Sequence, residues 1–537
     1  MKKYFYLVLI LILAIWLRLY NISVNPPSLY WDEASLGYNA YSILKTGRDE
    51  FGEFLPVSRF IAFGDYKPPG YIYASVIPVA LFGLSAVSVR LPSVLAGAVM
   101  VLVTYFLTFK IFRNGKISLL AAFFLSLSPW SLHLSRAAFE ANLAALFNLC
   151  AVYFFILSKD YKNRIFISFL FFVASFYTFN GNRIIAPLFI FALSVYYLRY
   201  ILGNLKWYLI SCLTALLLIY PSIGFLRSRE GKLRFQEVSI FNNLAPVEKA
   251  NQRISADGNT LLSRIIHNRR ILFATDYLVH FSHNFSGRFL FTHGDVNPRL
   301  SVQGMGQLYV WEMPFLLVSI LSLLVYKNKK LLFPAIWVLI ATIPAAAARE
   351  TPHALRTVSV LPVYQLFIAF GVYSAFNYLK VRLKPLFKQM VLLIAVLLFA
   401  VNNLYYLHIY HIHFPQNYSG EWQFGYRQMV EFVLDRQDYY DRIFVTSSLG
   451  RPYIYFAFYK PFEPEEFLNS KQATRDWFGF WQVNALGKID FDLKNLAGYQ
   501  RSALLVTSED HLPPDFRLLK IVKNLKGEAV YLIGDRI

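Results

Sequence analysis

Long apolar runs alternate with short polar segments along almost the whole chain. A helix needs about 20 predominantly apolar residues to cross the hydrocarbon core of a bilayer, and many of the runs approach or reach that length. The pattern predicts eleven transmembrane helices, near residues 4–20, 92–109, 117–133, 141–158, 165–179, 184–198, 207–225, 308–326, 331–348, 357–379 and 389–409. We therefore expect a polytopic α-helical membrane protein.

One further apolar run, "YIYASVIPVALFG" at 71–83, is too short to cross the membrane easily. If it does not cross, five basic loops fall on the same side as the N-terminal "MKK", as the positive-inside rule requires. These loops are 110–116, 159–164, 199–206, 327–330 and 380–388. We therefore expect a cytoplasmic N-terminus, an extracytoplasmic C-terminus, and a helix at 71–83 that lies at the outer interface.

The predicted topology leaves three large segments on the outer side: 21–91, 226–307 and the tail 410–537. The tail combines the helical pattern of "YRQMVEFVLDRQ" with the β-rich runs "RIFVTSS", "YIYFAFY", "SALLVTS" and "AVYLIGD". We expect it to be a small α/β domain that follows a transmembrane domain at 1–409. No internal repeat is visible in the sequence, which weighs against the inverted-repeat transporters.

The composition agrees with a membrane protein and narrows its partners. Charged residues make up 16% of the chain, whereas a soluble protein has about 25%. The net charge is +21, but the basic residues lie mostly in short loops between the predicted helices. That distribution fits membrane orientation and contact with anionic lipid rather than nucleic-acid binding. Both cysteines, Cys150 and Cys212, lie inside apolar runs, so no disulfide framework or zinc site is expected.

Two adjacent acids, Asp32 and Glu33, follow the first apolar run in "YWDEASLG". One interpretation is structural: carboxylates are favourable at a helix N-terminus, and a helix-like stretch, "EASLGYNAYSILKTG", continues to Gly47. The other interpretation is functional. A carboxylate in a partly desolvated site at the outer membrane face can serve as a general base or as a metal ligand.

A second candidate is Lys67 in "DYKPPG". The two prolines that follow lack backbone donors and force Lys67 into an extended conformation. At headgroup depth its ammonium is placed to meet a lipid phosphate; the alternative is an ordinary snorkelling lysine before a turn. Asp65, two residues earlier, either pairs with Lys67 or serves the site directly.

Further charged residues stand at the outer ends of predicted helices. Arg136 and Glu140 in "SRAAFEAN" lie four residues apart on one helical face. They form either a weak ion pair or part of a site, because an acid at the mouth of a span is costly. Arg183 in "NGNRIIAP", and His353 and Arg356 in "ARETPHALRTVSVLP", are each ordinary end-of-helix residues when taken singly. Together they surround the same face as the carboxylates.

Acids at the centre of a headgroup-level site, with cations around them, suit a particular reaction. A polyprenyl-phosphate sugar has an anionic head, an apolar tail and a phosphate leaving group. Basic side chains stabilise the charge that develops on the phosphate, and a carboxylate accepts the proton of an attacking hydroxyl on the opposite face of the sugar. The hydrolytic analogue of this geometry inverts the anomeric centre. The predicted function is an inverting glycosyltransferase with a polyprenyl-phosphate sugar as donor.

These motifs resemble the GT-C glycosyltransferases of the protein O-mannosyltransferase and lipid A aminoarabinose transferase type. The resemblance rests on "WDE" in the first outer loop, "KPP" further along that loop, the acid of "SRAAFEAN" at the start of the fourth predicted span, and the Arg of "ALRTVSVLP". It covers residues 1–225 well and 308–380 more loosely.

The resemblance implies roles for individual residues. Asp32 is implied to be the catalytic base, Glu33 its neighbour in the catalytic motif, and Glu140 the second acid of the site. Lys67 is implied to bind the donor phosphate, and the run 71–83 corresponds to the juxtamembrane helix of the family.

One position departs from the family. The aminoarabinose transferases carry an Arg three residues after the motif Asp, whereas this chain has Ser35. A second phosphate-binding cation must therefore come from elsewhere, and the candidates are Arg136, Arg183 and Arg356. Asp65 and His353 are accessory candidates.

Two other interpretations stay open: a transporter or flippase of lipid-linked saccharides, and a membrane anchor for the outer domain. The acids cluster at one membrane face rather than at mid-membrane depth, and eleven spans exceed what an anchor needs, so a transferase is favoured.

The acceptor class (a protein, a glycolipid or a polysaccharide) stays open, as does the sugar. Asp and Glu without His disfavour zinc but leave a divalent Mg²⁺ or Ca²⁺ cofactor open. The expected location is the cell membrane, in contact with its lipids.

Overall fold

The computed structural model describes residues 2–382 and 384–536 and divides them between two compact units. The helical unit contains residues 2–15, 96–134, 141–382 and 384–404. The sheet unit contains residues 16–95, 135–140 and 405–536. The first outer loop and the C-terminal tail therefore belong to one unit, which is a grouping that the sequence does not predict.

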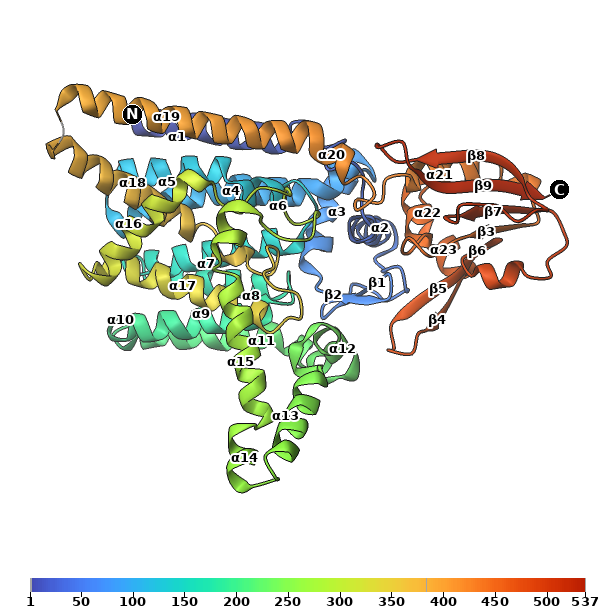
Figure 1. The fold of residues 1–537 in the computed structure, drawn as a ribbon, viewed down its shortest axis with the longest axis horizontal. Helices are drawn as coiled ribbons and strands as arrows, with labels where there is room; N and C mark the ends of the chain where they lie inside the picture. Colours follow the sequence, from blue (N-terminus) through green and yellow to red (C-terminus); the bar gives the residue numbers. More distant parts are fainter. Residues whose placement is uncertain (1, 383, 537) are drawn as a thin grey trace. The chain divides into compact units, whose positions relative to one another are not determined.

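The helical unit is built almost entirely from helices (Figure 1). Among them, α1, α4, α6, α7 and α19 also contribute residues to the sheet unit. The helices are α1 (Lys2–Leu19), α4 (Ala86–Phe112), α5 (Gly115–Leu127), α6 (Pro129–Ser135), α7 (Glu140–Leu157), α8 (Arg164–Phe176), α9 (Asn182–Tyr196), α10 (Leu198–Leu202), α11 (Leu205–Arg227), α12 (Arg229–Val238), α13 (Ala245–Ala256), α14 (Leu261–Ile266), α15 (Arg269–His283), α16 (Met313–Leu324), α17 (Lys329–Ala346), α18 (Val363–Arg382) and α19 (Pro385–His408).

Several of these helices are long enough to cross a membrane. Within residues 2–382 and 384–536, six helices pass a test of length and apolar composition, or seven if the bent pair α5 and α6 forms one span. Each of the eleven predicted spans overlaps a helix of the structure, and the shorter apolar helices α1, α8, α9 and α16 account for those that the test leaves out. The positions of the helices are thus confirmed, whereas the number that cross stays a prediction.

Polar side chains inside the helical unit bind backbone carbonyls of neighbouring segments. The indole N–H of Trp337 donates to the Ser359 carbonyl at 2.6 Å, and the Ser319 hydroxyl donates to the Phe367 carbonyl at 2.6 Å, which joins α16 to α18. Because an unpaired polar group inside a bilayer has no water to bind and costs several kcal/mol, such contacts fix the packing of the helices.

The sheet unit combines the first outer loop with a mixed sheet and short helices (Figure 1). The loop supplies α2, α3 and a two-stranded hairpin, and the tail supplies the rest. The helices are α2 (Trp31–Thr46), α3 (Gly70–Phe82), α20 (Phe414–Asn417), α21 (Tyr426–Leu434), α22 (Tyr453–Tyr459) and α23 (Pro464–Ser470). The strands are β1 (Phe60–Ala62), β2 (Asp65–Lys67), β3 (Arg442–Val445), β4 (Lys471–Arg475), β5 (Trp481–Leu486), β6 (Ile489–Asp490), β7 (Ala503–Thr507), β8 (Arg517–Lys523) and β9 (Ala529–Arg536).

The tail folds around a sheet whose seven described strands follow the order β4-β5-β6-β3-β7-β9-β8. Strand β3 pairs in parallel with β6 and β7, and the other neighbours are antiparallel. The tail contains the expected mixture of helices and strands, and the helix at α21 and the strands at β3, β7 and β9 are confirmed. The helix expected at 71–83 is also present, as α3.

One strand prediction is wrong. "YIYFAFY" at 453–459 reads as a strand because aromatic and β-branched residues favour strands, but the structure forms helix α22 there. The side chains from Tyr453 to Phe458 are all buried, so neighbours surround the helix on every side. Tertiary packing of this kind overrides intrinsic propensity, and a helix buried all round has no polar face by which to recognise it.

The tail holds the chain directly before α2. The Gln423 side-chain oxygen accepts the Trp31 backbone N–H at 2.8 Å and the Tyr455 hydroxyl at 2.6 Å. Tyr455 also donates to the Leu29 carbonyl at 3.2 Å. These contacts are buried or partly buried, and they set where α2 begins and hence where Asp32 lies.

The β1–β2 hairpin packs its turn against strand β5. Phe63 and Gly64 form the turn with φ of 41° and 87°, the left-handed backbone that two-residue hairpin turns require. The Trp481 backbone N–H donates to the Gly64 carbonyl at 3.3 Å. A Cβ added at Gly64 would lie 1.8 Å from the Trp481 carbonyl oxygen, so this contact has room for glycine alone.

We predict that Gly64→Ala destabilises the sheet unit. A positive φ costs Ala roughly 1–2 kcal/mol, and overpacking against the backbone adds about 1–3 kcal/mol. Gly487→Ala is the matched control, because Gly487 has a φ of +58° but nothing within 4 Å of the added Cβ. Thermal unfolding of the detergent-solubilised protein should show a clearly larger drop in midpoint for Gly64→Ala. Equal drops for both variants would contradict the tight contact.

Candidate active site

Lys67 lies among three carboxylates in the sheet unit. Its Nζ donates to Asp32 Oδ1 at 2.5 Å and lies 3.9 Å from both Asp65 Oδ2 and Glu140 Oε1. The side chains of Lys67 and Asp32 are 14% and 18% exposed, and those of Asp65 and Glu140 are 12% and 9% exposed. The structure thus brings four of the residues selected from the sequence into one partly desolvated cluster.

Each member of this carboxylate–lysine cluster is placed by its own backbone element. Asp65 and Lys67 are two apart on strand β2, so both side chains project from the same face of the hairpin. Asp32 lies in the first turn of α2, although the N-cap is Tyr30. Glu140 is the first residue of α7. The two acids therefore sit at helix N-termini, where the dipole favours negative charge.

The cluster holds more negative than positive charge. When ionised, the three carboxylates Asp32, Asp65 and Glu140 face a single ammonium, and they repel one another at these short separations. Lys67 is therefore the group that allows the carboxylates to stay close together. Its Nζ also lies 5.3 Å from the centre of the Phe63 ring, whose electron-rich face is a further favourable neighbour for a cation.

Glu33 does not share this environment with Asp32. Its side chain is fully buried and binds Arg90 in a two-point pair, with Nε to Oε1 and Nη2 to Oε2 both at 2.9 Å. The backbone N–H of Ala138 also donates to Glu33 Oε1 at 2.9 Å. Every polar atom of the carboxylate is thus engaged, so the geometry favours a positioning role for Glu33 over the catalytic role expected from the sequence.

Arg90 completes its hydrogen bonding on the backbone of the first outer loop. Besides the two bonds to Glu33, its guanidinium donates to the carbonyls of Ile22 at 2.9 Å, Pro26 at 3.0 Å and Ser28 at 2.6 Å. A guanidinium has five N–H donors, and all five are used here. Arg90 is therefore a fixed connection between α4, the loop and α2.

Arg136 is used in the same way. Its guanidinium donates to the Tyr410 hydroxyl at 3.1 Å and to four backbone carbonyls, which belong to Leu17 at 2.7 Å, Arg18 at 3.0 Å, Tyr20 at 2.7 Å and Asn25 at 2.9 Å. The side chain is buried and its five donors are again taken up. None is left for a phosphate, so the geometry favours a structural role for Arg136 over the phosphate contact expected from the sequence. Arg136 does not pair with Glu140 either, since Glu140 contacts Lys67 instead.

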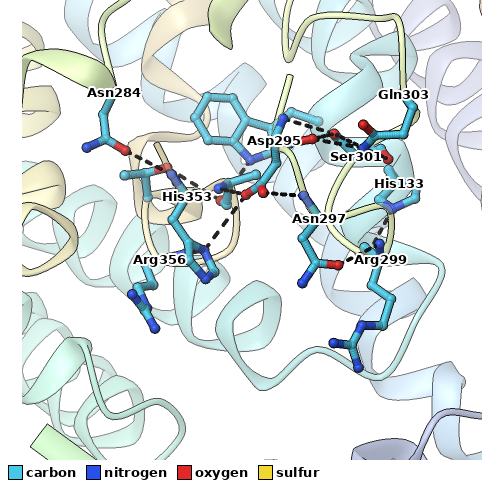
Figure 2. A network of polar contacts seen from close by, with 12 residues as sticks. His133, Asn284, Asp295, Asn297, Arg299, Ser301, Gln303, His353 and Arg356 are labelled. Atoms are coloured by element: carbon cyan, nitrogen blue, oxygen red, sulfur yellow. Dashed lines mark hydrogen bonds and ion pairs between the residues drawn. The ribbon is translucent and has the colours of Figure 1, made fainter. Parts of the chain in front are cut away.

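The helical unit holds a second polar cluster, which is centred on Asp295 (Figure 2). Asp295 Oδ1 accepts the Asn297 backbone N–H at 2.9 Å, and Oδ2 accepts the Ala354 N–H at 2.7 Å. His353 Nδ1 lies 4.0 Å from Asp295 Oδ2 and accepts the Arg356 backbone N–H at 3.4 Å. The loop before α16 is thereby bound to the segment before α18.

Burial determines the charge states in this cluster. Desolvation raises the pKa of Asp295 to about 6, against the hydrogen bonds from Asn297 and Ala354 that lower it. Desolvation also lowers the pKa of His353 well below its ordinary value, and the neighbouring Arg356 guanidinium lowers it further. His353 is therefore neutral at pH 7, with Nδ1 as acceptor and the proton on Nε2.

Three arginines of the helical unit keep a buried nitrogen without a hydrogen-bond partner in the described part of the chain: Arg164 and Arg183 through Nε, and Arg356 through Nη1. Arg183 lies at the start of α9, with its guanidinium carbon 5.9 Å from the Phe176 ring centre and 5.6 Å from that of Phe225. Buried donors that the protein leaves unused are costly and are suited to an anionic ligand.

Sequence reasoning missed several residues that shape the two clusters. Arg90 could have been found from the sequence, because a charged residue directly before an apolar span needs polar partners. Asp295 lies in a polar loop and carries no local motif. Gln423 and Tyr410 act through contacts far away in sequence, which one sequence without an alignment does not reveal.

No set of three or more His, Cys, Asp and Glu side chains is arranged to hold a metal ion in the part of the chain that the structure describes. In the carboxylate–lysine cluster the Lys67 ammonium supplies the positive charge among the acids. A divalent cation cofactor, which the sequence leaves open, stays a prediction.

Comparison with solved structures identifies the fold. The chain resembles ArnT from Cupriavidus metallidurans over nearly the full length of both chains. The undecaprenyl-phosphate-bound form matches with a TM-score of 0.53 and 11% identity, over 99% of this chain and 98% of that one. The apo form matches with a TM-score of 0.54 and 11% identity, over 100% and 99%. The oligosaccharyltransferase of Archaeoglobus fulgidus in its apo form matches with a TM-score of 0.50 and 14% identity, over 85% and 64%.

The fold is therefore that of the GT-C glycosyltransferases, which are membrane proteins, and the resemblance drawn from the motifs is confirmed. Residues 8–219 match the family model described as dolichyl-phosphate-mannose-protein mannosyltransferase. No curated protein matches the chain by sequence.

We predict that Glu33→Gln destabilises the protein far more than Asp32→Asn. The Gln variant leaves the Arg90 charge buried without its counter-charge, and breaking a buried pair typically costs about 3–5 kcal/mol. Asp32 is adjacent in sequence but partly exposed, so Asp32→Asn serves as the control. The thermal unfolding midpoint in detergent should fall by many degrees for Glu33→Gln and by few for Asp32→Asn. If the order is reversed, the structural assignment of Glu33 is wrong.

We predict that His353→Asn changes how stability depends on pH. The folded state keeps His353 neutral, while the unfolded state takes up a proton below about pH 6.5, so this residue lowers stability on acidification by up to about 1.4 kcal/mol per pH unit. Asp295 acts oppositely, since its raised pKa lets the folded state bind a proton first.

Asn lacks the titrating ring but keeps an oxygen for the Arg356 N–H. Relative to the wild type, the variant should gain stability when thermal unfolding is measured at about pH 5.5 instead of about pH 7.5. Parallel pH profiles for the two proteins would show that His353 is not held neutral.

Proposed function

We propose that the chain is an integral-membrane glycosyltransferase that moves a sugar from a polyprenyl-phosphate donor to a hydroxyl acceptor at the outer membrane face. The observation that carries the proposal is the contact of one ammonium, that of Lys67, with the carboxylates of Asp32, Asp65 and Glu140. The GT-C fold and the match of residues 8–219 to the mannosyltransferase family model support it. ArnT, which shares the fold, has been crystallised with undecaprenyl phosphate.

The cluster supplies the groups that such a transfer needs. The acceptor oxygen attacks the anomeric carbon and forms a new C–O bond while the bond from that carbon to the phosphate oxygen breaks. Asp32 takes the hydroxyl proton, and the polyprenyl phosphate leaves with the electron pair of the broken bond, stabilised by Lys67. Because phosphate is a good leaving group, no general acid is required. A single displacement of this kind inverts the anomeric centre.

Donor binding would also prepare the base. Without donor, Lys67 donates to Asp32 Oδ1 at 2.5 Å, so this oxygen is held in an ion pair. A donor phosphate offers Lys67 a competing anion. When the ammonium turns toward the phosphate, Asp32 Oδ1 is released from its contact with Lys67 and can accept the proton of the acceptor hydroxyl.

Other residues take supporting roles in this proposal. Glu33, Arg90 and Arg136 hold the loop and the start of α2 in place. Glu140 and Asp65 are further acids beside Lys67, with Glu140 the second acid of the site. Arg183 and Arg356 are the proposed additional phosphate cations, because each keeps an unused buried nitrogen, and His353 orients the segment that carries Arg356. The N-terminus is proposed to be cytoplasmic and the sheet of the tail extracytoplasmic.

We predict that Asp32→Asn abolishes most sugar transfer and leaves donor binding intact. Asn cannot accept the proton, and a general base contributes about 10²–10⁴-fold in rate. The assay follows transfer from a polyprenyl-phosphate sugar by the purified protein, with donor binding measured separately. Asp160→Asn is the control, since Asp160 is an exposed acid that pairs with Lys110 in the helical unit. Near-normal turnover by Asp32→Asn would overturn the assignment of the base.

We predict that Lys67→Ala weakens donor binding and slows transfer together. The leaving-group charge grows as the bond breaks, so loss of this cation should cost about a hundredfold or more in rate. Lys67→Arg should keep part of the activity, because the charge survives although the geometry of the fork differs. Lys45→Ala, on the exposed end of α2, is the matched control. A Lys67→Ala variant that transfers sugar as fast as Lys45→Ala would contradict the phosphate role.

A further inference from the structure

A helical protrusion leaves the helical unit between α11 and the loop before α16. It consists of α12, α13, α14 and α15 (Figure 1, green to yellow-green). Figure 1 shows α13, α14 and α15 extending crosswise to α11 and α17, which are span candidates, and away from the rest of the helical unit. A segment that leaves a bundle of spans at this angle runs along a membrane plane rather than through it.

The far end of this protrusion exposes apolar side chains. They are between 48% and 77% exposed, and they comprise four residues of α14 and one in the first turn of α15: Leu261, Leu262, Ile265, Ile266 and Ile271. We call them the apolar tip. In α14, Ser263 is the one side chain that is buried. If water surrounded the protrusion, these exposed apolar side chains would be unfavourable and would have no compensating contact.

Basic side chains accompany the apolar tip. Between residues 258 and 275 the chain has three arginines, Arg264, Arg269 and Arg270, and no Asp or Glu. All three are exposed. The nearest acid before this stretch, Asp257, is exposed, and its Oδ2 lies 2.8 Å from His267 Nε2. Exposed apolar groups flanked by exposed cations match a bilayer surface that contains anionic lipid.

One side of α15 exposes apolar side chains and the opposite side exposes an acid. Ile271 and Leu278 are seven residues apart, so they lie on nearly the same side of the helix. Asp276 is separated from both by well over a quarter turn and lies on the opposite side. All three are exposed. An interfacial helix places its apolar side in the lipid and its acidic side in water.

We infer that the apolar tip inserts into the outer leaflet of the membrane, with Arg264, Arg269 and Arg270 bound to anionic lipid headgroups. The occupant is the bilayer itself: the same chain carries the spans, so lipid is always present beside the protrusion, and the charge of the tip is complementary to an anionic headgroup layer. The protrusion thereby acts as a lateral anchor that fixes the tilt of the outer part of the helical unit relative to the membrane surface.

The test uses the full chain in lipid nanodiscs. An environment-sensitive thiol dye is attached to a cysteine at Leu262→Cys or at Leu278→Cys, and the matched control is Asp276→Cys on the opposite side of α15. Cys150 is buried and Cys212 partly so, and the unsubstituted protein labelled in parallel gives the background. Two quenchers are compared, a phosphatidylcholine brominated near the top of its acyl chains and aqueous iodide.

Dyes at residues 262 and 278 should be quenched by the brominated lipid at least about threefold more strongly than the dye at 276, because an interfacial helix sits about 5–10 Å into the boundary between headgroups and chains. Iodide should show the opposite order. The nanodiscs contain phosphatidylglycerol as the anionic lipid. Replacing it with phosphatidylcholine, or replacing the three arginines with Gln, should weaken lipid quenching of the dye at residue 262. Equal quenching of 262 and 276 by iodide would overturn the inference.

A third result is equally decisive. If the dye at 262 is protected from iodide but is not quenched by brominated lipid, a protein surface covers the tip, either a second copy of this chain or another protein, and the membrane assignment is wrong. Hydrogen exchange of the unsubstituted protein provides a measurement without variants. The amides of 259–272 should exchange more slowly in nanodiscs with phosphatidylglycerol than in nanodiscs of phosphatidylcholine alone, and identical rates would contradict the inference.

Discussion

The conformation of the first outer loop depends on two buried guanidinium groups. Arg90 and Arg136 donate to backbone carbonyls along residues 17–28, and each uses all of its N–H groups. A buried charge without partners is strongly unfavourable, and a buried carbonyl without a donor is costly as well. The two arginines and the loop therefore satisfy one another, and neither can rearrange alone. Glu33 adds the counter-charge for Arg90 and ties the start of α2 to the same frame.

This frame explains why adjacent acids have different environments. Glu33 and Asp32 are neighbours at the start of α2, so their side chains leave the helix in directions about 100° apart. One direction leads to Arg90 and full burial, and the other leads to Lys67 and partial exposure. The buried acid fixes the helix, and the accessible acid is left for chemistry. The tail contributes to the same frame, since Gln423 binds Trp31 and the Tyr453 hydroxyl donates to Glu50 at 3.1 Å.

Much of this arrangement could be predicted from the sequence, and the part that could not has a physical cause. Hydrophobic length located a helix at each of the eleven predicted spans, and the outer-face motifs selected Asp32, Asp65, Lys67 and Glu140, which the structure places together. The roles of Glu33 and Arg136 were not predictable, because one residue spacing fits both a surface ion pair and a buried set of hydrogen bonds. Which of these forms depends on backbone carbonyls, and carbonyls carry no sequence signal.

The same limit explains the tail and the second cluster. Helix α22 resembles a strand in composition because burial on every side removes the polar face that marks a helix. Asp295 was missed because its neighbours, Ala354 and His353, come from a segment far along the chain. The length of apolar runs predicts membrane crossing, and a charged residue at the end of a span indicates a candidate site. Contacts between segments far apart in the sequence depend on tertiary packing and are not visible in these patterns.

In the proposed mechanism the donor phosphate binds Lys67 in competition with Asp32. The most direct measurement is a structure of the full chain with a polyprenyl phosphate bound, determined by electron cryomicroscopy in a nanodisc. We expect a phosphate oxygen within hydrogen-bonding distance of Lys67 Nζ, and an ammonium that has moved away from its 2.5 Å contact with Asp32 Oδ1. A phosphate bound elsewhere, with the Lys67–Asp32 contact unchanged, would show that Lys67 does not bind the donor phosphate.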